Sequence, residues 1–204
     1  MKKKISLFLS ACLALCPMSL SAGTVSAVSE TDTAILQQQL DMPIISIVTD
    51  NNISSKENYV SASVSVYAED GVSQLEDTTI SIRLRGNSTL NALKKSYKMK
   101  FTAKQNLLGI GDGAAKSWNL VANYYDTSML RNMTAYEMGN MLDGMPYTPN
   151  CKSVEVYING QYQGVYLLCE AVNVNKNRVN ITENTDVVEN NGYLVEMTRY
   201  SHPI

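Results

Sequence analysis

The segment TISIRLRGNSTLNALKKSYKMKF, residues 79–101, decides the fold, because it holds two alternating runs on either side of a turn. In residues 79–85 and again in residues 95–101, apolar and polar side chains alternate, which is the period of a strand with one buried face. The Gly-Asn-Ser sequence at 86–88 interrupts the alternation and predicts a turn. The segment therefore predicts two neighbouring strands of a sheet. The cationic side chains on their polar face are Arg83, Arg85, Lys98 and Lys100.

The sequence on either side extends this sheet. Residues 59–68 alternate as strictly as the decisive segment and predict another half-buried strand. Asn159 and Gly160 lie between two apolar runs, which is a strong signal for a tight hairpin turn. The remaining predicted strands lie at residues 44–48, 118–122, 154–158, 165–170, 178–181 and 192–196.

Residues 127–143 form the one predicted helix. Their apolar side chains recur at helical spacing, and Asp126 with the two residues after it provides N-cap candidates. Gly144 and Pro146 end the helix. The predicted fold class is therefore α+β, an antiparallel sheet with one main helix.

The first 27 residues predict a secretory signal peptide. Three lysines precede a mostly apolar run, and small residues follow up to a cleavage point after Ala27. The alternatives are a membrane anchor, for which the run falls short of about 20 apolar residues, and a lipid anchor at Cys12. Residues 28–42 read as a linker, and residues 43–204 as the domain. We expect an exported protein without a stable membrane span after cleavage.

Charge and cysteine content limit the partners. Removing residues 1–27 takes away three lysines and no acidic residue, so the formal charge changes from −2 to −5. A mildly acidic domain has no electrostatic footprint for nucleic acid, and we expect no such partner. Cys151 and Cys169 remain, nearly symmetric about the hairpin turn. In an exported protein they either form a disulfide or stay as two half-buried thiols, and the sequence favours neither.

The common hydrolase motifs are missing from the sequence. Its single histidine, His202, lies at the end of the chain, and there is no HExxH, GxSxG or Walker A motif. A basic, hydroxyl-rich set remains around the 86–88 turn. Turn amides, arginine forks and a lysine suit a polyphosphate. The competing interpretation is a solvated sheet face that carries no ligand.

Several ordered segments resemble the CotH kinase family, the atypical secreted kinases named after spore-coat protein H. These segments are residues 82–88, 94–101, 118–120 with 126–132, 156–170 and 192–196. The resemblance implies that residues 43–204 are the amino-terminal part of a CotH kinase-like domain. The sheet and helix would then correspond to the small lobe of an atypical protein kinase, with the second lobe absent or incomplete.

The resemblance also implies an activity. Family members transfer the γ-phosphoryl group of ATP to Ser or Thr of spore-coat or cell-surface proteins, with Mg²⁺ or Mn²⁺. We therefore expect ATP and a divalent cation as cofactors, spore-coat or cell-surface proteins as substrates, and a secreted, cell-surface or spore-coat location. The alternative function is a non-catalytic spore-coat or cell-surface assembly module.

Carried onto this sequence, the resemblance implies a phosphate-binding turn made by Arg85, Asn87 and Ser88. Lys98 or Lys100, which share a strand face, would contact the α- and β-phosphates.

The resemblance implies three further roles. Glu137 in the helix would either pair with that lysine or be a solvated charge, and Tyr166 to Glu170 would border the adenine. The acidic residues that hold the metal and orient the acceptor would lie downstream of Ile204, so we expect no catalytic residue and no activity in this chain. We also expect an exposed apolar surface near residues 165–174.

Overall fold

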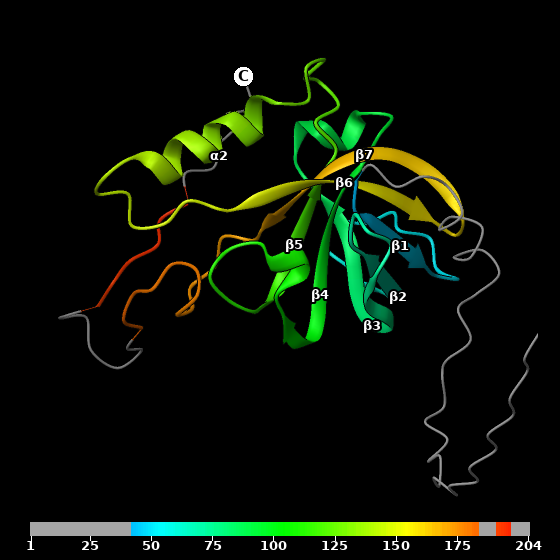
Figure 1. Ribbon diagram of the computed structural model, residues 1–204, viewed down its shortest axis with the longest axis horizontal. Coiled ribbons are helices and arrows are strands. Elements are labelled where there is room, and N and C mark those ends of the chain that lie inside the picture. Colours follow the sequence, from blue (N-terminus) through cyan, green and yellow to red (C-terminus); the bar gives the residue numbers. More distant parts are fainter. Residues whose placement is uncertain (1–41, 184–190, 197–204) are drawn as a thin grey trace, which may run out of the picture.

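The computed structural model describes residues 42–183 and 191–196, in which seven strands close into a barrel (Figure 1). Alternation gives each strand one apolar face, and closure turns these faces inward. The strands are β1 (Ile44–Val48), β2 (Val60–Tyr67), β3 (Ser73–Arg85), β4 (Ser96–Gln105), β5 (Ala115–Val121), β6 (Cys151–Ile158) and β7 (Gln161–Glu170). The helical elements are the 3-10 turns η1 (Ser88–Asn91) and η2 (Leu107–Gly109), and the α-helix α2 (Arg131–Met141).

One parallel pair of strands closes the barrel. Around it the strands follow the order β1-β2-β3-β4-β5-β7-β6, and every pair is antiparallel except β1 with β6, where Ile45 lies opposite Val156. The Asn159 side chain supports this closure. Its Oδ1 accepts from the Thr49 N–H at 2.9 Å, and its Nδ2 donates to the Thr49 carbonyl at 2.9 Å. Asn159 therefore forms the hairpin turn and also ties it to the end of β1.

The barrel interior is one apolar core. Trp118 lies within it, fully buried, and its indole N–H donates to the carbonyls of Gln105 and Ala115 at 3.3 Å each, which satisfies its one polar group. Inward-facing side chains of the core include Ile45, Ile47, Val64, Ile80, Ile82, Met99, Leu120, Val154 and Leu168. A filled interior leaves the outer face and the ends of the barrel for function.

The predicted α+β fold class is wrong. The described chain is mostly β, and its sheet closes on itself, unlike the sheet-and-helix small lobe of a kinase. The alternation identified strands and their buried faces, but it carries no information about which distant strands pair. The parallel β1–β6 pair joins two strands that an open sheet would leave as edges.

The helix begins later than residue 127. Met129 has a φ of +58°, in the left-handed region, which interrupts the helical path. The Asp126 carboxylate accepts from the N–H groups of Ser128 at 3.1 Å and Arg131 at 2.9 Å, so it holds the turn before α2. Asp126, a predicted N-cap residue, therefore stabilises the turn that precedes α2, and the helix itself begins at Arg131.

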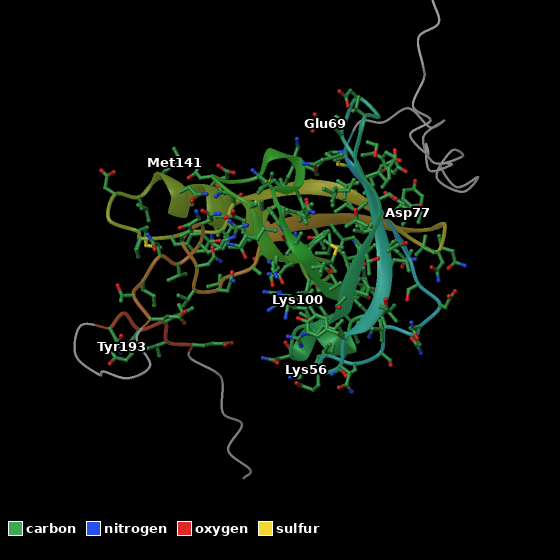
Figure 2. The ribbon with its side chains drawn as sticks, turned by 90° about the horizontal axis from the view of Figure 1, so that it is seen from below. Lys56, Glu69, Asp77, Lys100, Met141 and Tyr193 are labelled. Atoms are coloured by element: carbon green, nitrogen blue, oxygen red, sulfur yellow. The ribbon has the colours of Figure 1, made fainter. Side chains whose placement is uncertain are left out.

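Helix α2 lies outside the barrel, and Gly139 is its one buried residue (Figure 1). Met138 and Met141 are 61% and 81% exposed, and Figure 2 shows Met141 far from the barrel strands. Residues 166–171 are buried, so of the expected apolar surface near 165–174 the clearly exposed member is Val172. Exposed apolar side chains also lie on α2, and Leu142 and Met145 after the helix are exposed as well.

Two predicted strands are not formed. Residues 192–196 are irregular, and near residues 178–181 there is only an isolated bridge between Val174 and Val179. The predicted signal peptide and residues 28–41 of the linker lie outside the described residues. In the described part of the chain, no helix has the length and apolar character needed to cross a membrane.

Candidate functional site

A row of polar side chains crosses the outer face of the barrel. Consecutive members are direct partners in the strand register: Arg83 on β3 lies opposite Lys98 on β4, and Lys98 lies opposite Asn119 on β5. Asn119 lies opposite Cys169 on β7, and Cys169 opposite Cys151 on β6. The alternation that buries their neighbours therefore gathers these five groups on one surface.

The basic end of this row lines a cavity of about 520 Å³, here called the basic pocket. Its barrel wall carries Arg83, Arg85, Lys98 and Asn119. The rest of its lining includes Tyr136 of α2, Glu170 at the end of β7 with residues 171–172 after it, and residues 194–196. Segments distant in sequence thus meet over three cationic side chains.

The basic pocket has unpaired polar atoms. Arg83 Nε and Asn119 Oδ1 are buried without a hydrogen-bond partner among the described residues. No ion pair within the described residues joins the pocket cations Arg83, Arg85 and Lys98 to a carboxylate. The Arg83 guanidinium lies 5.0 Å from the centre of the Tyr59 ring, which holds it in place by a cation–π contact. An unpaired buried donor such as Arg83 Nε is costly, and the oxygen of an anion that reached it would relieve that cost, whereas Asn119 Oδ1 is an acceptor and would need a donor.

Glu170 lies at the edge of the basic pocket, but its carboxylate is already engaged. Its Oε1 lies 2.7 Å from Arg178 Nη1, an ion pair whose geometry is not that of an aligned hydrogen bond. Its Oε2 accepts from the Tyr147 hydroxyl at 3.0 Å, and from the backbone and side-chain amides of Asn150 at 3.0 and 3.1 Å. Burial, followed by the Glu170 charge, raises the pKa of Tyr147 well above its usual value. Glu170 is therefore a structural anchor.

A neighbouring cavity of about 360 Å³ shares Arg85 with the basic pocket and contains Lys94. The Lys94 ammonium donates to the Val165 carbonyl and lies 4.2 Å from the centre of the Tyr166 ring. Burial lowers the pKa of Lys94. The Lys94 ammonium is thus engaged by two residues of β7, Val165 and Tyr166.

The structure brings together three of the eight predicted cofactor-binding residues. Arg85, Lys98 and Glu170 line the basic pocket. Tyr166 is only 1% exposed and belongs to the barrel core, so its ring faces away from the pocket. Its inward position follows from strand alternation, which places it on the same face as Leu168.

The other four predicted residues lie elsewhere. Lys100 is exposed on β4 (Figure 2) and does not line the basic pocket. Asn87 and Ser88 are exposed, and Asn87 Oδ1 accepts from Lys56 Nζ at 3.2 Å. Glu137 is exposed on α2.

Sequence reasoning missed two residues of this region. Asn119 is the polar residue of the otherwise apolar segment 118–122, and Arg178 lies in the predicted strand 178–181, which is not formed. Strand alternation from Trp118 would have placed Asn119 on the outer face. Nothing local predicts the partner of Arg178.

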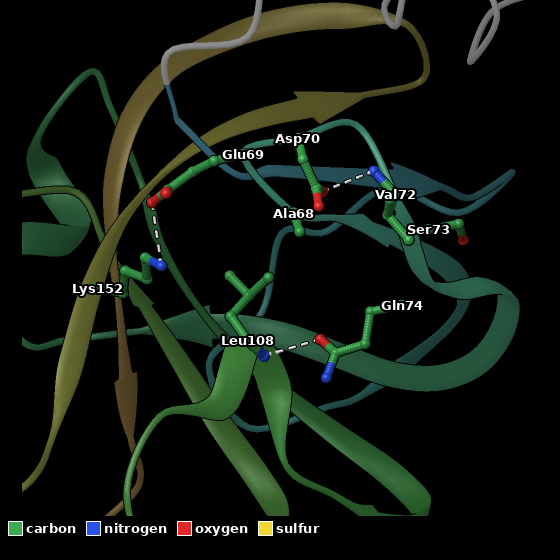
Figure 3. Close-up of a pocket in the computed structure, with 8 residues that line it drawn as sticks. All are labelled: Ala68, Glu69, Asp70, Val72, Ser73, Gln74, Leu108 and Lys152. Carbon is green, nitrogen blue, oxygen red and sulfur yellow. Dashed lines mark hydrogen bonds and ion pairs between the residues drawn. The ribbon is translucent and has the colours of Figure 1, made fainter.

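A third cavity, of about 500 Å³, lies at the β2–β3 end of the barrel (Figure 3). Its polar groups are paired with one another: Lys152 Nζ lies 3.0 Å from Glu69 Oε1, and the Leu108 N–H donates to Gln74 Oε1 at 2.7 Å. These pairs leave it without the unpaired donors of the basic pocket. Within residues 42–183 and 191–196, no group of three or more His, Cys, Asp or Glu could hold a metal ion.

The chain from residue 82 onward matches a known protein family. A family model described as CotH kinase protein matches residues 82–202, which is more than half of the chain. The match includes Arg83, Arg85, Lys98 and Asn119 of the basic pocket. No curated protein matches the chain.

Proposed function

The chain belongs to the CotH kinase protein family, and from that premise we propose that its basic pocket binds the phosphates of ATP. This binding would serve ATP-dependent phosphorylation of Ser or Thr in spore-coat or cell-surface proteins, and we assign none of the catalytic residues of that reaction to the described part of the chain. The observation that carries the proposal is the convergence of Arg83, Arg85 and Lys98 on one cavity without carboxylate partners among the described residues.

The donor chemistry of the pocket suits a triphosphate. Arginine presents a fork of N–H donors that matches two phosphate oxygens, and lysine supplies a compact positive charge. The unpaired Arg83 Nε gives one donor with no competing partner among the described residues. Lys98, directly opposite Arg83 on the next strand, places a second cation at the same level of the barrel wall.

The apolar side of the pocket suits the adenine. Ala171, Val172 and Leu194 line the pocket and provide carbon surface there. Residues 171 and 172 follow the end of β7 and are not part of a strand, so we assign their backbone amides and carbonyls to a base edge. This assignment replaces the role expected for the Tyr166 ring.

The proposal includes Mg²⁺ or Mn²⁺, but the described residues do not by themselves make a protein site for it. The metal would therefore be held by the nucleotide and would neutralise phosphate charge there. The role of Arg83, Arg85 and Lys98 is to bind and orient the phosphates.

Calorimetric titration of the purified protein with ATP, in the presence of Mg²⁺ or Mn²⁺, tests the pocket. Arg85→Ala and Lys98→Ala should each weaken binding about 10- to 100-fold, the range for a lost hydrogen bond to a charged group. The matched control is Lys100→Ala, because Lys100 is exposed on the same strand and lies outside the pocket. Its affinity should equal that of the wild type.

Equal affinities for the Lys98 and Lys100 variants would contradict the assigned pocket. Absence of any binding by the wild-type protein would favour the alternative function, a non-catalytic assembly module of the spore coat or cell surface. The proposed export is tested separately by sequencing the amino terminus of secreted protein, which should begin at Val28.

A further inference from the structure

Cys151 and Cys169 are direct partners across the β6–β7 pair. The Glu170 N–H donates to the Asn150 carbonyl at 3.1 Å, so residues 150 and 170 occupy a hydrogen-bonding position that continues the ladder. The next pair along an antiparallel ladder is a non-hydrogen-bonded one. Cys151 and Cys169 occupy that position.

This position suits a covalent bridge. Opposite residues of a non-hydrogen-bonded pair have Cα atoms about 4.5 Å apart, and disulfides span Cα separations of about 4.4–6.8 Å. Both thiols also point to the same face, since opposite residues of a strand pair share a face. The two sulfurs therefore need no rearrangement of the strands to meet.

Access differs between the two thiols. Cys169 is 1% exposed and shares a side-chain hydrogen bond with Tyr136 of α2, whereas Cys151 is half-buried. An oxidant from solution thus reaches Cys151 first, and Cys169 acts as the resolving thiol from beneath it.

We propose that Cys151 and Cys169 are a redox modification site that forms a cross-strand disulfide with a disulfide-type oxidant. The Cys151 thiolate attacks a sulfur of the oxidant, whose S–S bond breaks and releases one thiolate. The Cys169 thiolate then attacks Cys151 Sγ in the mixed disulfide and releases the second thiolate. The two protein thiols lose two electrons and two protons, and the oxidant becomes two thiols.

The bridge would fasten β6 to β7 beside the basic pocket, because Asn119 is the next member of the same cross-strand row. It would also remove the Cys169 thiol from its hydrogen bond with Tyr136, which lines that pocket. The site does not depend on nucleotide binding, so it stands whether or not the pocket binds ATP.

Peptide mapping of the full chain after incubation with oxidised glutathione tests the site. Trypsin cleaves after Arg131, Lys152 and Lys176, so the two cysteines fall in separate peptides, 132–152 and 153–176. Under non-reducing conditions these peptides should appear as one cross-linked species, which reduction separates. Recovery of both peptides with alkylated thiols, or each carrying only glutathione, would overturn the proposal.

Thermal unfolding of the wild type and of Cys151→Ser provides a second test that does not depend on peptide mapping. The oxidised wild type should unfold several degrees above the reduced wild type, because the bridge constrains the unfolded chain. Cys151→Ser should show the same midpoint with and without reductant. A wild type whose midpoint does not respond to reductant would contradict the bridge as a constraint on the fold.

Discussion

Glu170 and Arg178 form a buried ion pair, 2.7 Å between Oε1 and Nη1, that joins the end of β7 to the segment after it. The two residues are only 2% and 3% exposed. The same guanidinium lies 5.2 Å from the centre of the Trp118 ring and donates to the Gly113 and Asn177 carbonyls at 3.3 and 2.7 Å. One arginine thus connects a loop, the barrel core and the strand that leads out of the barrel.

Replacing one partner of this pair should be costly. Glu170→Gln leaves the Arg178 charge buried and unpaired, so the free energy of unfolding should fall by about 3–5 kcal/mol in urea titration. The control is Glu69→Gln, which breaks the exposed ion pair with Lys152 and should cost no more than about 1 kcal/mol. Similar losses for the two variants would show that the buried pair is not the anchor inferred here.

Alanine variants of Gly111 and Gly109 would distinguish the cost of backbone strain from the cost of a steric clash at the new side chain. Both have positive φ, +69° and +67°, so alanine at either position should cost about 1–2 kcal/mol. A Cβ at Gly111 would also lie 2.2 Å from Glu170 Oε1, whereas a Cβ at Gly109 would meet nothing within 4 Å. Gly111→Ala should therefore be less stable than Gly109→Ala by about 2 kcal/mol in chemical denaturation. Equal stabilities would mean that Glu170 can move aside without loss.

Tyr166 should matter for stability and not for nucleotide binding. Tyr166→Leu removes a buried ring and its cation–π contact with Lys94, so unfolding should become easier by about 2 kcal/mol. The affinity of the folded variant for ATP should equal that of the wild type. An affinity loss as large as that of Lys98→Ala, at unchanged stability, would return Tyr166 to the adenine role.

The reduced thiols should react slowly at neutral pH. Burial, followed by the nearby Glu137 charge, raises the pKa of Cys151 to about 11. In a Cys169→Ser variant, the alkylation rate of Cys151 should therefore rise about tenfold per pH unit from pH 8 to 10, because only the thiolate reacts. A rate that levels off near pH 9 would indicate an ordinary thiol.

The same pKa shift links stability to pH. An unfolded thiol loses its proton near pH 8.5, while folded Cys151 keeps it to about pH 11 and folded Cys169 to about pH 12. The unfolded state then binds fewer protons, so the free energy of unfolding of the reduced protein should fall as pH rises through this window. The Cys151→Ser, Cys169→Ser double variant should show a smaller slope in denaturation curves measured from pH 8 to 11.

Much of the local fold was predictable from the sequence. Strict alternation identified β2, and the Asn159-Gly160 pair identified the β6–β7 hairpin. These features depend on neighbours in sequence. The barrel does not, because its closing β1–β6 pair is made between segments on opposite sides of most of the chain. Local patterns cannot report such a pairing, and the predicted α+β antiparallel sheet with one main helix was wrong.

The candidate site divides in the same way. Strand alternation placed Arg85 and Lys98 on one surface, and the structure gives them a shared pocket. Alternation along β7 would also have turned Tyr166 inward, although the resemblance assigned it to a ligand. Arg178 was unpredictable, because its role depends on Glu170 and Trp118, which reach it through tertiary packing alone.

Barrel closure also depends on contacts between residues that are far apart in the sequence. Thr49 and Asn159, hydrogen bonded to each other, are 110 positions apart, so during synthesis β1 must wait for most of the domain before its parallel partner exists. Until then β1 presents an unpaired edge, which is a template for association with other chains. Contacts of such long sequence separation slow folding, typically to milliseconds or seconds. Closure of this barrel therefore requires its first strand to meet its sixth, a contact that no local hairpin can supply.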